Sequence, residues 1–344
     1  MPIQFPTLRH PIVQAPLGGG PSTPELAAAV SDAGGLGFLA GGYLTAEALG
    51  QQISSARKLT SELFAVNLFC LHESEVDRVA IERFARRLER EAHKRGVQLG
   101  EPRYEDDFWD EKLELVLTEG IEIVSFTFGC PSAATVSQLH DAGSAVWVTV
   151  TDPREVATAV HAGADALVVQ GLEAGGHRGS FVDRDGVGEI GLLALLRLVR
   201  ARTDLPLVAA GGIADGAGAA GALAAGASAA ALGTAFMLCP EAGTSEPHRE
   251  ALRGGGRTRL TRAFTGRRAR GIVNRFMSDY DREAPSAYPH VHHLTQPLRK
   301  AAREAGDAEA INLWAGQAYS LTRELPAREL VEELSAEITG AGGH

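Results

Sequence analysis

Short apolar runs alternate with helical segments along most of the chain, and a glycine commonly separates the two. The first clear case is a helix over Thr23–Ala33 that ends at Gly34-Gly35 and precedes the apolar run Leu36–Leu39. Glycine suits this joint because the residue after a helix often takes a left-handed backbone conformation. Similar joints recur before later apolar runs, at Gly120, Gly143, Gly163 and Gly226. Such alternation predicts right-handed βαβ units with strands buried on both faces.

Eight apolar runs qualify as strands by this pattern: Ile12–Ala15, Leu36–Leu39, Phe64–Phe69, Ile123–Phe128, Ala145–Val150, Ala166–Val169, Leu207–Ala210 and Ala229–Leu232. Eight parallel strands alternating with helices predict an α/β fold of the (β/α)8 TIM barrel type. An open doubly wound sheet is the alternative, but no early Gly-x-Gly-x-x-Gly joint with an acidic partner downstream supports it.

A barrel of this type typically takes about 250 residues, so the 344 residues of the chain imply insertions. We expect a helical insertion near 71–110, with a charged outer helix from Glu73 to Arg95. Residues 239–306, rich in Arg, Gly and Pro, are expected to form a smaller inserted, lid-like domain of mainly helical or irregular structure. The barrel then comprises 1–238 and 307–335, and a last helix over Asp307–Glu324 completes its outer ring.

Composition narrows the class of protein. An apolar content of 44% supports a sizeable core, and a net charge of −10 disfavours nucleic acid or an anionic membrane as a partner. No apolar run approaches the length that crosses a bilayer, and the N-terminus lacks the order of a signal peptide. The cysteines are 3 in number and far apart, as expected of reduced thiols. We therefore expect a cytoplasmic globular protein, monomeric or homodimeric.

The stretch Ala166–Ser180 carries the clearest signal for a site. Its apolar run ends in one polar side chain, Gln170, and a loop around His177 follows. That loop contains three glycines: Gly175, Gly176 and Gly179. Glycines at this density let a backbone approach a ligand closely, and barrels build active sites at the C-terminal ends of their strands. The alternative is a plain turn with a solvated histidine, but the strand-end amide beside the histidine favours a site.

Other strand ends add candidate ligand-binding groups. Gly211-Gly212 follows the seventh strand and Gly233-Thr234 the eighth, and bare backbone N–H groups there bind phosphate without Lys or Arg. Asn67 and Gln170 offer amides that pair with donor and acceptor edges of a heteroaromatic ring. Phosphate on one side and amides on the other predict a mononucleotide cofactor, with flavin as the obvious candidate.

These motifs resemble the nitronate monooxygenase family, formerly called 2-nitropropane dioxygenases. The most specific match is Glu-Ala-Gly-Gly-His at 173–177, preceded by Gln-Gly. Further matching stretches run from one end of the chain to the other, among them Gln14–Gly20, Ser125–Ser132, Ala209–Gly216, Gly233–Phe236 and Ala263–Phe276.

The resemblance implies an FMN-dependent enzyme that oxidises alkyl nitronates with O2 to a carbonyl compound and nitrite, by one-electron transfer to the flavin. It implies that His177 is the active-site histidine, which binds the substrate anion or acts as a base on a neutral nitroalkane. It also implies that FMN is contacted by Asn67, Gln170, Gly175, Gly212, Ala231, Leu232, Gly233 and Thr234, the last four at its phosphate. Thr127 stands where one branch of the family has a second histidine.

Two other functions stay open at this point. An NAD(P)H-dependent flavin reductase of the enoyl-thioester reductase type shares the Glu-Ala-Gly-Gly-His loop and needs no separate nicotinamide motif. A catalytically idle barrel used for binding is the other, and the intact set of polar strand ends argues against it.

Two clusters of charged or metal-binding residue types have simpler interpretations than a site. Arg253–Arg275 holds eight arginines, but the acidic total charge favours a solvated or salt-bridged face, or a lid, over a nucleic-acid patch. His292 and His293, with His290 nearby, lack acidic or thiol ligands at metal spacing, so surface histidines and no metal are expected. Arg178 is expected at the surface as readily as in the site.

Overall fold

The computed structural model describes residues 5–341, and its central element is an eight-stranded parallel sheet in the order β1-β9-β8-β6-β5-β4-β3-β2. An isolated parallel bridge between Val13 and Leu36 joins the two ends of this sheet. The sheet consists of β1 (Ile12–Gln14), β2 (Gly37–Ala40), β3 (Phe64–Phe69), β4 (Ile123–Thr127), β5 (Ala145–Val150), β6 (Ala166–Gln170), β8 (Leu207–Ala210) and β9 (Ala229–Leu232). The predicted (β/α)8 barrel is therefore confirmed, with each strand within a residue or two of its expected position.

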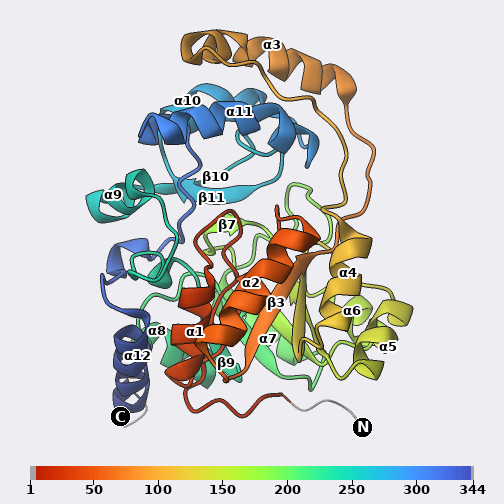
Figure 1. Cartoon of the computed structure of the whole chain (residues 1–344), viewed down its shortest axis with the longest axis vertical. Coiled ribbons are helices and arrows are strands. Elements are labelled where there is room, and N and C mark those ends of the chain that lie inside the picture. The colour runs from red at the N-terminus through yellow and green to blue at the C-terminus, as the bar shows by residue number, and fades with distance from the viewer. Residues whose placement is uncertain (1–4, 342–344) are drawn as a thin grey trace.

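Helices follow the strands around the barrel (Figure 1). They are α1 (Pro24–Asp32), α2 (Ala46–Leu59), α4 (Trp109–Thr118), α5 (Ala133–Asp141), α6 (Val156–Ala162), α7 (Leu192–Arg200), α8 (Gly216–Ala224) and α12 (Ala327–Ala341). The Thr23 hydroxyl caps α1 by accepting a hydrogen bond from the Leu26 N–H at 3.0 Å. No helix within residues 5–341 is long and apolar enough to cross a membrane.

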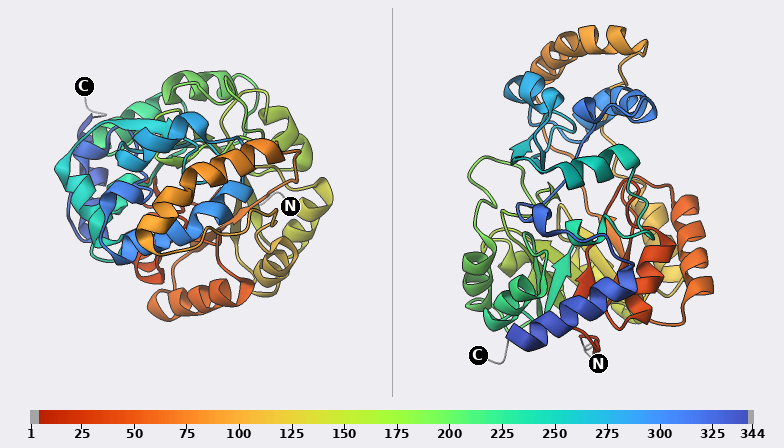
Figure 2. Two further views of the ribbon diagram at one scale, coloured as in Figure 1. Left: turned by 90° about the horizontal axis from the view of Figure 1, so that it is seen from above. Right: turned by 90° about the vertical axis from the view of Figure 1, so that its left-hand side faces the viewer.

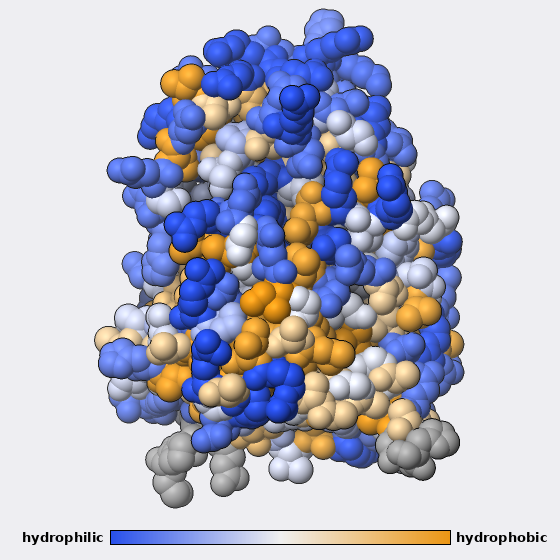
Figure 3. Space-filling model, turned by 180° about the vertical axis from the view of Figure 1, so that it is seen from behind, coloured by the Kyte–Doolittle hydropathy of each residue, from blue (hydrophilic) through white to orange (hydrophobic). Residues whose placement is uncertain are grey.

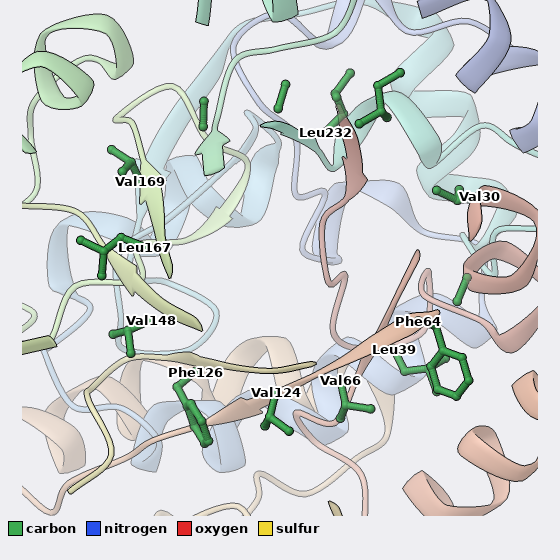
Figure 4. Close-up of a cluster of buried hydrophobic side chains, with 14 of the residues drawn as sticks. Val30, Leu39, Phe64, Val66, Val124, Phe126, Val148, Leu167, Val169 and Leu232 are labelled. Carbon is green, nitrogen blue, oxygen red and sulfur yellow. The ribbon is translucent and has the colours of Figure 1, made fainter. Parts of the chain in front are cut away.

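Two apolar layers hold the barrel together. Outward-facing side chains of the strands pack under the helices, as Figure 4 shows for Val66, Val148 and Leu167. Inward-facing side chains, including Phe38 and Trp147, fill the barrel interior. Phe5 stacks on Trp147 with ring centroids 5.2 Å apart. This alternation follows from the two-residue period of side chains along a strand.

A second body lies across one end of the barrel (Figures 1 and 2). This upper layer comprises α3 (Arg78–Arg95), α9 (Glu246–Gly254), β10 (Thr258–Thr261), β11 (Ala269–Ile272), α10 (Arg275–Tyr280) and α11 (His290–Glu304). It has its own core, in which Phe84 and Leu88 of α3 pack with Phe264, Phe276 and Leu294. Hydrophilic side chains cover most of its top, whereas apolar ones gather toward the middle of the face in Figure 3.

The upper layer refines what the sequence predicts for the insertions. The charged helix predicted from Glu73 begins at Arg78 and packs on α11, away from the ring of barrel helices. The proposed division into 1–238 with 307–335 and 239–306 stays a prediction, and its residues 1–4 lie outside the described ones. The helix α3 of the 71–110 insertion packs in the core of the upper layer and not on the barrel.

The predicted helix over Asp307–Glu324 is wrong. That segment contains two short 3-10 turns, Ala308–Ala310 and Tyr319–Leu321, and between them it pairs with β11. The Ile272 N–H donates to the Leu313 carbonyl at 2.8 Å, so tertiary pairing prevails over helix propensity. The last helix is α12, which packs against α1 and α8.

Candidate active site

A cavity of about 860 Å³ is lined both by residues at the C-terminal ends of the strands and by residues of the upper layer. This volume falls within the range of small-molecule and cofactor sites. Eight of the predicted site residues line it: His177, Asn67, Gln170, Gly175, Gly212, Ala231, Gly233 and Thr234. Leu232 does not, because its side chain points outward into the apolar layer under the helices (Figure 4). Its carbonyl accepts from the Ala15 N–H at 2.9 Å, so the predicted cofactor contact of Leu232 stays a prediction.

His177 lies in a strand and not in an irregular loop. Gly176–His177 form β7, which pairs antiparallel with β11 and joins the barrel to the upper layer. Gly175 precedes it, where a Cβ atom would lie 2.5 Å from the Gly316 N atom. Only glycine lets the chain pass here, so this residue is needed for the position of His177 whatever its role toward a cofactor.

Gln170 holds the same segment from the barrel side. Its Nε2 donates to the His177 carbonyl at 3.1 Å, and its Oε1 accepts from the Gly179 N–H at 2.9 Å. Both ends of the Gln170 amide are thus hydrogen-bonded to the backbone of the segment 177–179. The predicted flavin contact of Gln170 remains a prediction, and the structure adds a positioning function for its side chain.

Asn67 is held by the neighbouring strand. Its Nδ2 donates to the Ser125 hydroxyl at 2.8 Å and to the Thr127 hydroxyl at 3.1 Å. Thr127, at the position of a second histidine in one branch of the resembled family, therefore orients an amide and lines the cavity. The Asn67 Oδ1 atom makes no hydrogen bond within residues 5–341, so it can accept one from a ligand.

The imidazole of His177 sits in an apolar, positively charged environment. Phe128, Tyr288 and Trp314 surround it at ring-centroid distances of 5.8, 5.8 and 5.4 Å. Burial lowers the pKa of His177 to about 3, and the nearby guanidinium groups of Arg267 and Arg299 add to this effect. The ring is therefore neutral at physiological pH.

Thr265 is the hydrogen-bond partner of this ring, and sequence reasoning missed it. Its hydroxyl oxygen lies 2.9 Å from His177 Nε2 and 3.3 Å from the Arg267 carbonyl oxygen. If the hydroxyl donates to the Arg267 carbonyl, it accepts from His177 Nε2–H and Nδ1 is an acceptor. If the hydroxyl donates to Nε2 instead, the imidazole proton stays on Nδ1. Nδ1 makes no hydrogen bond within residues 5–341, and the ring lines the cavity, so that proton can be donated to a bound anion. The sequence signal that could have identified Thr265 is the stretch Ala263–Phe276, which contains it and resembles the same family.

The arginines near the site are buried, so of the two positions considered for Arg178 the surface one is wrong. Arg178 is 1% exposed and donates to the carbonyls of Gly171 at 2.5 Å and Gln170 at 2.9 Å. The Arg267 guanidinium lies 4.2 Å from the Phe128 ring centroid and donates to the Arg178 carbonyl at 3.1 Å. These buried cations support backbone carbonyls of the His177 segment.

The arginine-rich stretch 253–275 is only in part the expected salt-bridged face. Arg262 and Arg268 share Asp183 at 3.2 and 2.9 Å, and Arg253 pairs with Glu324 at 2.6 Å. Arg267, by contrast, is buried on carbonyls. The stretch thus ties the upper layer to the segment that follows His177.

Two of the three histidines of α11 are buried and not at the surface, and His293 is half-buried. His290 and His292 are 7% and 8% exposed, and the His292 ring stacks on Tyr43. Within residues 5–341, no three His, Cys, Asp or Glu side chains are grouped to hold a metal.

Charge around the cavity is one-sided. Among the described residues, its lining includes Arg299, Lys300 and Arg303 but no aspartate or glutamate. The whole chain has 43 acidic and 33 basic residues, so this distribution is opposite to its overall charge. A low-dielectric cleft with cations and no carboxylates favours anionic ligands.

The glycines after β8 and β9 form a cradle for such a ligand. Gly211 and Gly212 have φ of +108° and +72°, a conformation that favours glycine. The N–H groups of Gly212, Gly233 and Thr234 donate no hydrogen bond to any residue in 5–341, and all three residues line the cavity. Unpaired N–H groups at two adjacent strand ends fit a phosphate group.

Comparison with known proteins gives a consistent result. A family model described as nitronate monooxygenase matches residues 2–337. The chain is 43% identical to a nitronate monooxygenase of Pseudomonas aeruginosa, over 97% of both chains, and 41% identical to one of Paraburkholderia phytofirmans, over 95% and 92%.

Solved structures agree. A nitroalkane oxidase from Streptomyces ansochromogenes superposes with a TM-score of 0.95 at 50% identity, covering 97% of each chain. FabK from Thermotoga maritima superposes with a TM-score of 0.77 at 26% identity, covering 97% of this chain and 94% of its own.

Proposed function

The chain belongs to the nitronate monooxygenase family and is a flavin-type oxidoreductase, and from this premise we propose that it oxidises alkyl nitronates with FMN and O2. The products are a carbonyl compound and nitrite, and the nitronate is oxidised in a one-electron step. The observation that carries the proposal is the cavity lining, which combines a neutral histidine, cationic side chains and no carboxylate.

The residues present fit FMN. The unpaired N–H groups of Gly212, Gly233 and Thr234 suit its phosphate, and the free Oδ1 of Asn67 suits a donor on its ring system. Bound there, the flavin supplies the electron acceptor, and the protein supplies position and electrostatics. A single phosphate cradle supports FMN over a dinucleotide.

His177 and the cationic side chains then act on the substrate. A nitronate already carries negative charge on its nitro oxygens, so it needs a hydrogen-bond donor and positive potential and no base. We propose the tautomer of His177 that is protonated on Nδ1, with the Thr265 hydroxyl donating to Nε2; this Nδ1–H is the donor, and Arg299 supplies the positive potential. With a pKa of about 3, His177 is a poor base for a neutral nitroalkane. We therefore propose that nitronates are used in preference to nitroalkanes.

The likeness to FabK over almost the whole chain supports a second candidate, a flavin reductase that takes electrons from NAD(P)H and acts on an enoyl thioester. The two candidate functions differ in the electron donor to the flavin, which is the nitronate in the first and NAD(P)H in the second. The polypeptide that carries either activity is proposed to be cytoplasmic and monomeric or homodimeric.

Anaerobic reduction separates the two candidates. The purified protein is expected to contain FMN, identified by chromatography after denaturation, and to lose its flavin absorbance on addition of ethyl nitronate. Admission of air should then release nitrite. Bleaching by NADPH together with no response to nitronate would support the reductase, and a colourless protein that cannot be loaded with FMN would contradict both.

A further inference from the structure

A second, smaller cavity of about 120 Å³ adjoins the active-site cavity. Three residues line both: Tyr43, His292 and Gln296. The rings of Tyr43 and His292 stack face to face, with centroids 4.5 Å apart and planes at 4°. This stack, which we term the Tyr43–His292 wall, separates the two cavities.

The wall is built from both parts of the molecule. Tyr43 follows β2 of the barrel, and His292 lies on α11 of the upper layer. Tyr43 has a φ of +68°, rare for a bulky residue, and its N–H donates to the Asp107 Oδ1 atom at 2.8 Å. Lys112 pairs with the same carboxylate at 2.6 Å. A left-handed non-glycine residue persists only where its surroundings enforce it, so the backbone that carries this ring is held in place, and the contacts with Phe69 and His292 position the ring.

Aromatic side chains connect the wall to His177. Phe128 lies 5.8 Å from the His177 ring and 4.6 Å from Phe69, measured between centroids. Phe69 in turn meets the Tyr43 ring edge-on at 5.2 Å. The apolar side of the cavity therefore runs from the histidine toward Tyr43, and an alkyl chain whose anionic head lies at His177 would extend along it.

The side cavity beyond the wall can take an extension of such a chain. Its lining is mixed: Leu71, Phe108 and Pro289 are apolar, and the charged residues are Asp107 and the ion pair of Arg103 with Glu105 at 3.0 Å. Its 120 Å³ corresponds to about four water molecules at roughly 30 Å³ each. Removal of the Tyr43 ring would add the space of that ring and join the two cavities.

We propose that the Tyr43–His292 wall is the specificity determinant that sets the longest alkyl chain the active site accepts. This inference rests on the proposed function, since it takes an alkyl anion as the substrate. Tyr43 acts by shape: it ends the apolar side of the site and takes no part in electron transfer.

Straight-chain carboxylates of increasing length test the wall without turnover, because they carry the anionic two-oxygen head of a nitronate but are not oxidised. Their Kd values are measured by calorimetry on the purified, flavin-loaded protein. In the wild type, affinity should rise about fourfold per added methylene until the chain meets Tyr43, and then stop rising. In Tyr43→Ala and Tyr43→Gly the rise should continue, so that the longest carboxylate binds about tenfold tighter than to the wild type.

Two control variants sharpen this result. Tyr43→Phe keeps the stacked ring and should keep the wild-type length limit. Leu71→Trp fills the side cavity, so it should leave the wild-type profile unchanged but cancel the gain when combined with Tyr43→Gly. The glycine variant also guards against misfolding, because glycine adopts the left-handed backbone of position 43 without strain.

An unchanged length limit in both Tyr43→Ala and Tyr43→Gly, or an equal shift in Tyr43→Phe, overturns the proposal. The proposed function is judged separately, by nitrite release from ethyl nitronate, whose chain is too short to reach Tyr43. That activity can be present while the length limit stays fixed, and the calorimetric limit can move even where no nitronate is oxidised.

Discussion

Replacing Thr265 by valine removes the hydroxyl group that contacts the His177 ring while keeping the shape of the side chain. Thr265 is 2% exposed, and its Oγ1 atom lies 2.9 Å from His177 Nε2. A lost hydrogen bond costs about 0.5–1.5 kcal/mol, and a buried nitrogen left without a partner costs about 1–3 kcal/mol. We expect the free energy of unfolding to fall by about 1–3 kcal/mol and Tm by a few degrees.

The effect on activity should be larger than the stability loss alone predicts. Without the hydroxyl group, neither the tautomer nor the orientation of His177 is fixed, and the Nδ1 proton offered to the substrate is lost for part of the time. We expect kcat/KM on ethyl nitronate to fall about 10- to 100-fold, which corresponds to about 1.4–2.7 kcal/mol of transition-state stabilisation. Flavin content, read from absorbance, should stay at the wild-type level because Thr265 is not part of the glycine cradle.

Two matched variants control for this experiment. Thr265→Ser keeps the hydroxyl and should retain activity within about threefold. Thr261→Val removes a buried hydroxyl from the same upper-layer segment, where it donates to Asp281 at 2.6 Å, and should lower Tm without lowering kcat/KM. If Thr265→Val kept wild-type kcat/KM, or if Thr261→Val lost as much, the assignment of Thr265 as the positioning partner of His177 would be refuted.

Three further outcomes are expected. Burial lowers the pKa of His177 from 6.5 to about 3 and that of His248 from 6.5 to about 4, so the unfolded chain binds protons that the folded chain does not. The free energy of unfolding, measured by urea titration, should therefore fall as pH is lowered from about 6.5 toward 4. The His248→Gln variant should show a smaller dependence on pH. Gly175→Ala places a Cβ atom 2.5 Å from the Gly316 backbone nitrogen, so kcat/KM should drop at least about tenfold and Tm should fall. In the control Gly254→Ala the new Cβ atom has no other atom within 4 Å, and neither kcat/KM nor Tm should change beyond error. Arg299→Gln removes positive charge from the cavity and should raise the KM for nitronate about tenfold without loss of flavin, and an unchanged KM would show that Arg299 does not attract the anion.

The sequence predicts the barrel well because each strand is a short apolar run, and five of the eight follow a helix-ending glycine, a signal contained within a few residues. It predicts the cavity-lining glycines for the same reason. It fails at Asp307–Glu324, where pairing with β11, far away in the chain, prevents the predicted helix. His292 was expected at the surface because its aromatic partner, Tyr43, lies far away in the chain. For Arg178 the sequence left a surface position and a site position open, since nothing in the sequence marks the carbonyls of Gln170 and Gly171 as its partners.

Thr265 and His177 are far apart in the sequence, which explains why the sequence predicts His177 as a site residue but not Thr265. His177 lies in a glycine-rich segment that is unusual on its own, whereas Thr265 becomes meaningful only once β11 pairs with β7 and brings the two together. The imidazole thus depends on three supports from different parts of the chain: the Gln170 amide from the barrel, the Thr265 hydroxyl from the upper layer and the glycine at position 175. Because β7 is shared by both bodies, any change that separates the upper layer from the barrel displaces His177 before the barrel itself unfolds. As denaturant is added, activity should therefore be lost at a lower concentration than the one that unfolds the parallel sheet. His177 is neutral and close to buried arginines only while the upper layer and the barrel remain packed together.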